Sequence, residues 1–164
     1  MGDERLLERL GRMVPGYAGY KEKEQRREAD KRQRMHLVRL LEKEQQRLES
    51  VKADLVTKKS LDAVGNADTI GRRFERLIDR IRFASYGYAG FFDAEKVKED
   101  KLDRVYEFDS KLIEDVGKIS GKMGEIESAS EVDVIRDRLL ELERILGEVN
   151  TKFNQREEIL KGFA

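Results

Sequence analysis

Apolar residues spaced three and four positions apart recur along most of this chain, and this spacing limits its fold more than any other feature. Such spacing places one apolar stripe along a helix, and in the C-terminal segment it continues for about four heptads. Arg156 is the one interruption there. No segment of the 164 residues sustains the alternation with period two that a half-buried strand requires. We therefore predict an all-α protein. The stripe consists of Val132, Ile135, Leu139, Leu142, Leu146, Val149, Phe153, Leu160 and Phe163.

The same spacing predicts three further long helices and one short helix. Apolar stripes run through residues 37–55, 70–84 and 102–126, and a short amphipathic segment covers residues 3–13. Repeats close to 3.5 residues predict an elongated, left-handed and mostly antiparallel bundle with coiled-coil-like contacts. We expect the longest helix to run from about Tyr20 to Thr57, and we expect a turn at 65–68, which reads Gly-Asn-Ala-Asp.

A short motif occurs twice at a constant offset of 71 residues. Residues 4–20 read ERLLERLGRMVPGYAGY and residues 75–91 read ERLIDRIRFASYGYAGF, with eight identical positions. Each copy joins a helix to a longer helix, so we interpret the chain as one domain, 1–164, with an internal duplication. The halves cover about 4–58 and 75–126, and about 131–162 forms an extra C-terminal helix.

The repeated Gly-Tyr-Ala-Gly-aromatic motif has two structural interpretations. Glycine adopts positive φ at little cost, which predicts a joint between helices. Alternatively, the motif lies inside a continuous helix and allows a close helix contact. Its aromatic residues either pack against the end of the bundle or form an exposed interaction surface. They are Tyr17, Tyr20, Tyr86, Tyr88, Phe91 and Phe92.

Charge is balanced over the whole chain but divided between its halves. Residues 1–82 carry 21 Lys/Arg and 15 Asp/Glu, a net charge of +6, and residues 83–164 carry 13 and 19, a net charge of −6. This division predicts that the halves pack against each other. The basic stretch 21–34 is either a solvated helix face or a contact for an anionic partner, nucleic acid or lipid headgroups. Its candidate contacts are Lys23, Arg26, Arg27, Lys31 and Arg34.

The sequence contains little of the chemistry that catalysis requires. It has no cysteine and a single histidine, His36, and no phosphate-binding, metal-ligand or nucleophile motif. We therefore predict no catalytic residue, no cofactor and no metal. Asp109 is the most informative carboxylate, because it occupies an apolar stripe and must be paired if it is buried. We expect it to meet an arginine or tyrosine across the bundle. Glu44 and Arg156 are the other charged stripe members, and one interpretation is that all three pair with one another.

These features favour a non-enzymatic interaction or scaffolding module over an enzyme. The expected partner is another protein or a second copy of the chain, and the sequence indicates no small-molecule substrate. The alternative is a binder of anionic surfaces through the stretch 21–34. No apolar run approaches the roughly 18–20 residues of a membrane span, and the first residues lack the apolar stretch of a signal peptide. We therefore expect a cytoplasmic protein.

Overall fold

A computed structural model describes residues 2–85 and 87–162 and shows an all-α fold. No strand occurs within these ranges, so the fold class predicted from the apolar spacing is confirmed. The short helix α1, the 3-10 helix η1 and the single-turn α4 accompany four long helices. The elements are α1 (Gly2–Met13), η1 (Lys23–Gln25), α2 (Arg26–Thr57), α3 (Leu61–Arg82), α4 (Ala89–Asp93), α5 (Glu99–Ser128) and α6 (Val132–Lys161).

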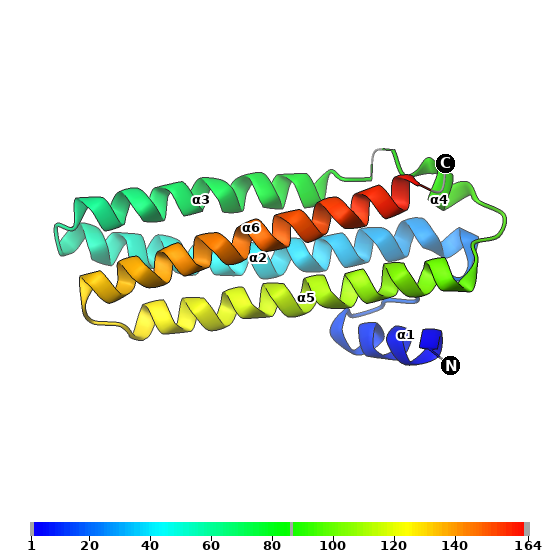
Figure 1. Cartoon of the computed structure of the whole chain (residues 1–164), viewed down its shortest axis with the longest axis horizontal. Coiled ribbons are helices and arrows are strands. Elements are labelled where there is room, and N and C mark those ends of the chain that lie inside the picture. The colour runs from blue at the N-terminus through cyan, green and yellow to red at the C-terminus, as the bar shows by residue number, and fades with distance from the viewer. Residues whose placement is uncertain (1, 86, 163–164) are drawn as a thin grey trace.

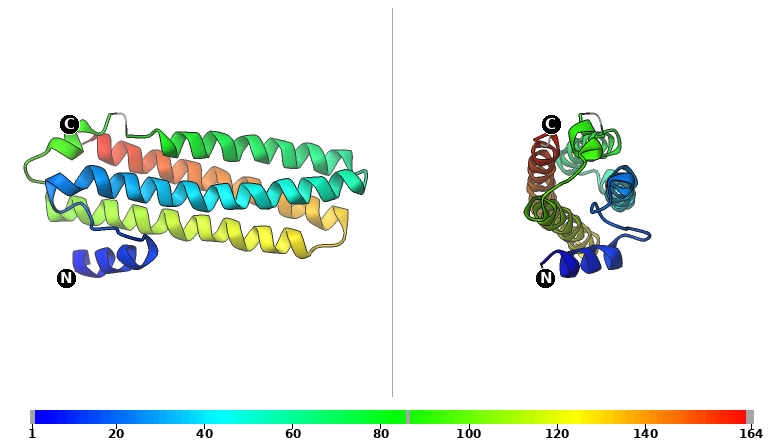
Figure 2. Two further views of the ribbon diagram at one scale, coloured as in Figure 1. Left: turned by 180° about the vertical axis from the view of Figure 1, so that it is seen from behind. Right: turned by 90° about the vertical axis from the view of Figure 1, so that its right-hand side faces the viewer.

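The four long helices form an elongated bundle made of two hairpins (Figure 1). Helices α2 and α3 form one antiparallel hairpin, and α5 and α6 form the other. Between α3 and α5 the described residues 83–85 and 87–98 lie across one end of the bundle. As a result α2 packs beside α5 and α3 beside α6, and the helices of each of these pairs run in the same direction (Figures 1 and 2). We call this the crossing end, and the end with turns 58–60 and 129–131 the hairpin end.

Helix α1 lies outside the four-helix bundle and packs on α5 (Figure 2, right). Its apolar stripe places Leu10 against the core, where this side chain is fully buried. Arg9 adds a polar contact, because its guanidinium donates to the Ser110 hydroxyl and lies 3.5 Å from the Glu114 carboxylate. The N-terminal helix is therefore held mainly by one neighbour.

The predicted apolar stripes face the interior along all four long helices. Burial of these side chains supplies the main favourable contribution to folding, at about 25 cal/mol per Å² of apolar surface removed from water. Glu44, a charged member of the α2 stripe, is also buried and pairs with Arg47 at 2.6 Å. Phe163 lies outside the described residues. The buried stripe residues include Leu37, Leu41, Leu48, Val51 and Leu55 in α2, Leu102, Val105, Leu112, Val116, Ile119, Met123 and Ile126 in α5, and Ile135, Leu139, Leu142, Leu146, Val149, Phe153 and Leu160 in α6.

The two oppositely charged halves pack against each other, as the charge distribution predicts. Among the described residues, six ion pairs join a cation of residues 1–82 to a carboxylate of residues 83–164, and one joins Arg156 to Asp30 in the opposite sense. Most lie on the bundle surface, where each contributes roughly 0–1 kcal/mol, so they orient the halves more than they stabilise them. The six pairs are Arg9–Glu114, Lys23–Glu95, Arg27–Asp93, Arg47–Glu127, Arg73–Glu143 and Arg80–Glu157.

Two predicted helix boundaries are wrong. The turn expected at 65–68 lies inside α3, because Ala63 and Ala67 are buried and this packing outweighs the turn preference of the intervening Gly-Asn. The chain instead reverses at 58–60, where Lys59 has a φ of 56°. The longest helix begins at Arg26 rather than Tyr20, after the 3-10 turn 23–25.

Both copies of the glycine motif lie in joints between helices, but their conformations differ. Gly16 and Gly19 have φ values of 74° and 86°, so the first copy is a non-helical connection. In the second copy only Gly87 has a positive φ, of 91°, whereas Gly90 lies in the short helix α4. The alternative of a long continuous helix through the motif is therefore wrong for both copies, and similar sequences form different bends.

Replacing Gly19 with alanine is expected to destabilise the protein by more than about 1 kcal/mol. Its backbone has positive φ, and a Cβ would approach Leu7 Cδ1 to 2.6 Å and the Tyr106 hydroxyl to 2.8 Å. Gly117 is the matched control, because it is helical and a Cβ there would meet no atom within 4 Å. Gly117→Ala should stabilise by roughly 0.5–1 kcal/mol. Urea denaturation measures both, and equal stability of the two variants would contradict the requirement for positive φ in this joint.

Candidate functional site

The aromatic residues of the repeated motif pack inside the crossing end of the bundle. Tyr20, Tyr88 and Phe91 are fully buried, and Tyr17 and Phe92 are nearly so. The Tyr20 ring stacks on the Tyr106 ring, with 5.5 Å between the ring centroids. It also makes an edge contact with the Phe91 ring at a centroid distance of 5.4 Å. This second contact brings the two copies of the motif together. Tyr86 lies outside the described residues. The five described candidates therefore form part of the core and do not present an exposed interaction surface.

Arg156 is the centre of a buried polar cluster at the same end. Its side chain is 1% exposed and lies between two fully buried carboxylates. The guanidinium donates from Nε to Asp109 Oδ1 at 2.5 Å and from Nη2 to Asp30 Oδ1 at 3.0 Å. The Tyr20 hydroxyl donates to Asp109 Oδ2 at 2.5 Å and accepts from Arg156 Nη2 at 3.0 Å. Asp109 therefore meets both an arginine and a tyrosine, whereas Glu44 pairs elsewhere.

Arg34 completes the cluster and connects it to α3. Its Nε donates to Asp30 Oδ2 at 2.9 Å, and its Nη1 donates to the carbonyls of Ile81 and Arg82 at 3.0 and 2.6 Å. These carbonyls belong to the last turn of α3, whose final carbonyl groups lack helical partners. Two buried aspartates thus meet two buried arginines, and the cluster carries no net charge.

Burial and neighbouring charges determine the protonation of the cluster. Burial raises the pKa of Tyr20 well above its ordinary value, and Asp109 raises it further. Burial alone would lower the pKa of Arg156, but Asp109, Tyr20 and Asp30 together raise it well above the ordinary value. Burial also raises the pKa of Asp109, against the hydrogen bonds from Arg156 and Tyr20. The tyrosine therefore stays a neutral donor and the arginine stays charged at neutral pH.

Arg26 joins the two copies of the glycine motif from the start of α2. Its Nε donates to the Tyr20 carbonyl at 2.9 Å, and its Nη1 donates to the carbonyls of Ala94 and Phe91 at 2.6 and 3.3 Å. The guanidinium also lies 5.7 Å from the centroid of the Phe91 ring. This arginine satisfies backbone carbonyls that no regular helix would satisfy.

The candidate anionic contacts of residues 21–34 are largely engaged within the protein. Arg26 and Arg34 are buried, at 2% and 5% exposure, so they cannot reach a phosphate outside the bundle. Lys23 lies 2.8 Å from Glu95, and Arg27 lies 3.4 Å from Asp93 and stacks over the Phe92 ring. Lys31 is exposed. The apolar periodicity did not identify the two buried arginines, because their helix face contains few apolar residues.

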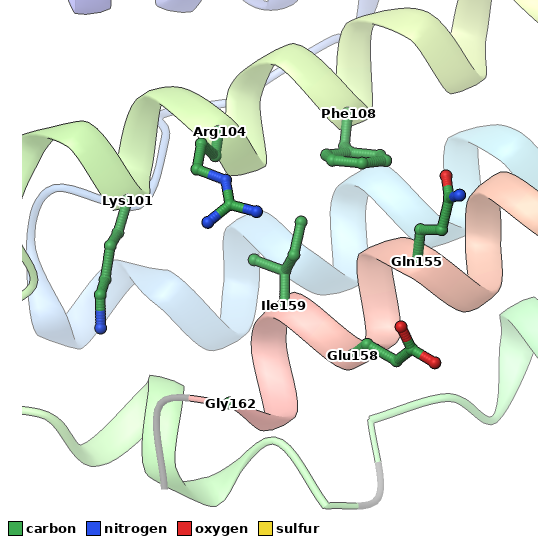
Figure 3. A pocket seen from close by; sticks show the side chains of 7 residues that line it. All are labelled: Lys101, Arg104, Phe108, Gln155, Glu158, Ile159 and Gly162. Carbon is green, nitrogen blue, oxygen red and sulfur yellow. The ribbon is translucent and has the colours of Figure 1, made fainter.

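A groove of about 460 Å³ lies between α5 and α6 near the crossing end (Figure 3). Its centre is formed by the half-buried side chains of Phe108 and Ile159, which come from different helices. Arg104 projects from the α5 side and Glu158 from the α6 side. The apolar spacing of the sequence does not indicate this groove, because its members lie beside the apolar stripes. Phe108, an apolar residue adjacent to a stripe position, is the signal that could have indicated it. The lining residues are Lys101, Arg104, Phe108, Gln155, Glu158, Ile159 and Gly162.

Two opposite charges of this groove have no ionic partner within the described part of the chain. Neither the Arg104 guanidinium nor the Glu158 carboxylate makes a hydrogen bond or ion pair there. Both side chains are exposed, so leaving them unpaired costs little in the isolated chain. The groove therefore combines an apolar centre, one cationic edge and one anionic edge.

The residues in the described ranges include no group of three or more His, Cys, Asp or Glu side chains that could hold a metal ion. Within the same ranges no helix has the length and hydropathy needed to cross a membrane. Comparison of the chain with protein-family models, curated proteins and solved structures finds no match.

Removing the charge of Arg156 tests the buried cluster. Arg156→Met keeps much of the side-chain volume but leaves Asp109 without its guanidinium partner, and we expect a destabilisation of roughly 3–5 kcal/mol. Arg144→Met is the matched control on the same helix, because Arg144 is exposed and, within the described residues, its one ion pair is with Glu148 one turn later. Its effect should stay below about 0.5 kcal/mol. Urea denaturation at neutral pH measures the free energy of unfolding of both variants. Similar losses of stability would show that the buried cluster matters no more to the fold than a surface ion pair.

Proposed function

We propose that this protein is a non-enzymatic, cytoplasmic interaction module that pairs with a second copy of itself through the α5/α6 groove. The observation that supports this proposal is the arrangement of charge around the groove. Arg104 lies on the α5 edge and Glu158 on the α6 edge, and neither has an ionic partner in the described part of the chain. Such a surface is complementary to itself.

A two-fold axis along the groove, parallel to the helices, would place α5 of one copy over α6 of the other. Arg104 of each copy would then face Glu158 of its partner, which is the reciprocal contact of an isologous interface. The apolar centre would be covered at the same time. Aromatic side chains in such central positions supply a large part of binding energy in protein interfaces, and Phe108 is of this type.

The anionic-surface alternative has weaker support. Of its five candidate cations, Arg26 and Arg34 are buried, and Lys23 and Arg27 are paired with carboxylates. Lys31 alone among them is exposed with no ion pair in the described residues. Tight binding to phosphates requires several free cations on one face. We therefore place this function second.

Exchanging the two groove charges tests self-association directly. Arg104→Glu and Glu158→Arg should each weaken the dimer by about tenfold or more, because like charges then face each other. The double variant restores opposite charges and the original net charge, and it should recover most of the affinity. Sedimentation at several protein concentrations measures the dimer affinity of the two single variants and of the double variant.

The control for this experiment is Arg39→Glu on α2, an exposed arginine outside the groove. It should leave the dimer unchanged. A wild-type protein that stays monomeric at every concentration would refute self-pairing. If that monomer captured a cellular protein, and lost it on Arg104→Glu alone, the groove would be an interaction site for a different partner.

A further inference from the structure

A second groove, of about 360 Å³, lies on another face of the bundle, between α3 and α6. We call it the arginine groove, because three arginines of α3 line it. They occupy positions 73, 76 and 80, which share one face of a helix. The opposite wall comes from α6. The lining residues are Thr69, Arg73, Arg76, Leu77, Arg80, Leu146, Gly147 and Asn150.

The three arginines differ in how firmly they are held. Arg80 is fixed, because it donates to Asn150 Oδ1 at 2.8 Å and to Glu157 Oε2 at 2.7 Å and lies over the Phe153 ring. Arg73 makes one ion pair, with Glu143 at 2.8 Å, on the half-exposed edge. Arg76 is exposed and makes no hydrogen bond or ion pair within the described residues. Two of the three guanidinium groups, those of Arg73 and Arg80, are therefore paired with carboxylates, whereas Arg76 has no ion pair within the described residues.

The floor of the groove is apolar and is left open by a glycine. Leu77 and Leu146 are buried at its base. Gly147 lies in the interior of α6, where glycine weakens a helix relative to alanine. Close packing does not require it, since a Cβ at this position would meet no atom within 4 Å. The absence of a side chain at Gly147 instead leaves the groove open above Leu77 and Leu146, which are 4% and 2% exposed.

We propose that the arginine groove binds a small amphiphilic anion, with a phosphate or carboxylate head and an apolar body. The head would be held by Arg76, whose planar fork suits two oxygens of either group. Arg73, on the exposed edge, can turn towards the same head. The apolar body would fill the open space over Gly147, above the buried Leu77 and Leu146. This site is separate from the α5/α6 groove and does not depend on self-association.

Octyl phosphate is the probe, and isothermal titration calorimetry on the full chain measures its binding. Inorganic phosphate tests the head alone and octanol the body alone; octanoate replaces phosphate by carboxylate. We expect octyl phosphate to bind more tightly than either inorganic phosphate or octanol, because each carries only half of the recognised chemistry. The comparison with octanoate shows which head the groove prefers.

Two variants and one control locate the binding. Arg76→Gln should weaken octyl phosphate binding by about tenfold, the effect of losing a charge-assisted contact. Gly147→Leu fills the groove and should abolish binding, while its melting temperature shows whether the bundle is intact. Arg39→Gln makes the same charge change on α2, where Arg39 is exposed and unpaired in the described chain, and should bind like wild type.

The proposal is overturned if octyl phosphate does not bind wild type at millimolar concentration. It is equally overturned if Arg76→Gln and a folded Gly147→Leu bind as wild type does, because the anion would then occupy another surface. Equal weakening by Arg76→Gln and Arg39→Gln would indicate non-specific attraction to positive charge. These outcomes do not bear on self-association, which involves residues of a different groove.

Discussion

The buried guanidinium of Arg156 is the interaction on which the arrangement of the bundle depends. It joins α6 to Asp109 on α5 and to Asp30 on α2, and Asp30 in turn holds Arg34, which binds the last carbonyls of α3. All four long helices are therefore connected at one level. Buried ionic clusters contribute little net stability compared with apolar packing, but separating their members is very unfavourable. Apolar stripes alone permit several registers, so the cluster is suited to selecting one of them.

The joints at the crossing end close over this cluster. Tyr20 belongs to the first copy of the glycine motif and donates to Asp109, while Phe91 of the second copy packs against the Tyr20 ring. Arg26 then binds carbonyls of both copies. Because these aromatic rings exclude water, the hydrogen bonds beneath them lie in a medium of low dielectric and are strengthened. The repeated sequence thus supplies the cover of a polar core, and its tyrosines have a structural role.

The sequence predicts the apolar half of this structure well and the polar half in part. Heptad spacing identifies the stripe residues, and Asp109 and Arg156 stand out because they interrupt apolar stripes. Arg26 and Arg34 do not stand out, because a stretch with Ala29 as its one apolar residue resembles a solvated helix. Their burial depends on the carbonyls left free by distant joints, which no local pattern reveals. The turn expected at 65–68 fails for a related reason, since tertiary burial of two alanines outweighs the local preference. Both grooves involve residues beside the stripes, where periodicity predicts only exposure.

Helix α6 links the buried cluster to the two surfaces. Arg156 is buried in the interior. Its neighbour Gln155 lines the α5/α6 groove. Gly147, two and a half turns before Arg156, lines the arginine groove. Because Arg156 is held by two other helices, α6 cannot rotate about its axis or slide without breaking the cluster. That restraint fixes which side chains of α6 face each groove. Sites on rigid, pre-positioned helices lose less conformational entropy on binding than sites on mobile loops. A buried polar cluster that adds little to stability therefore holds both grooves in one geometry, and the binding proposed for each groove would not have to establish that geometry.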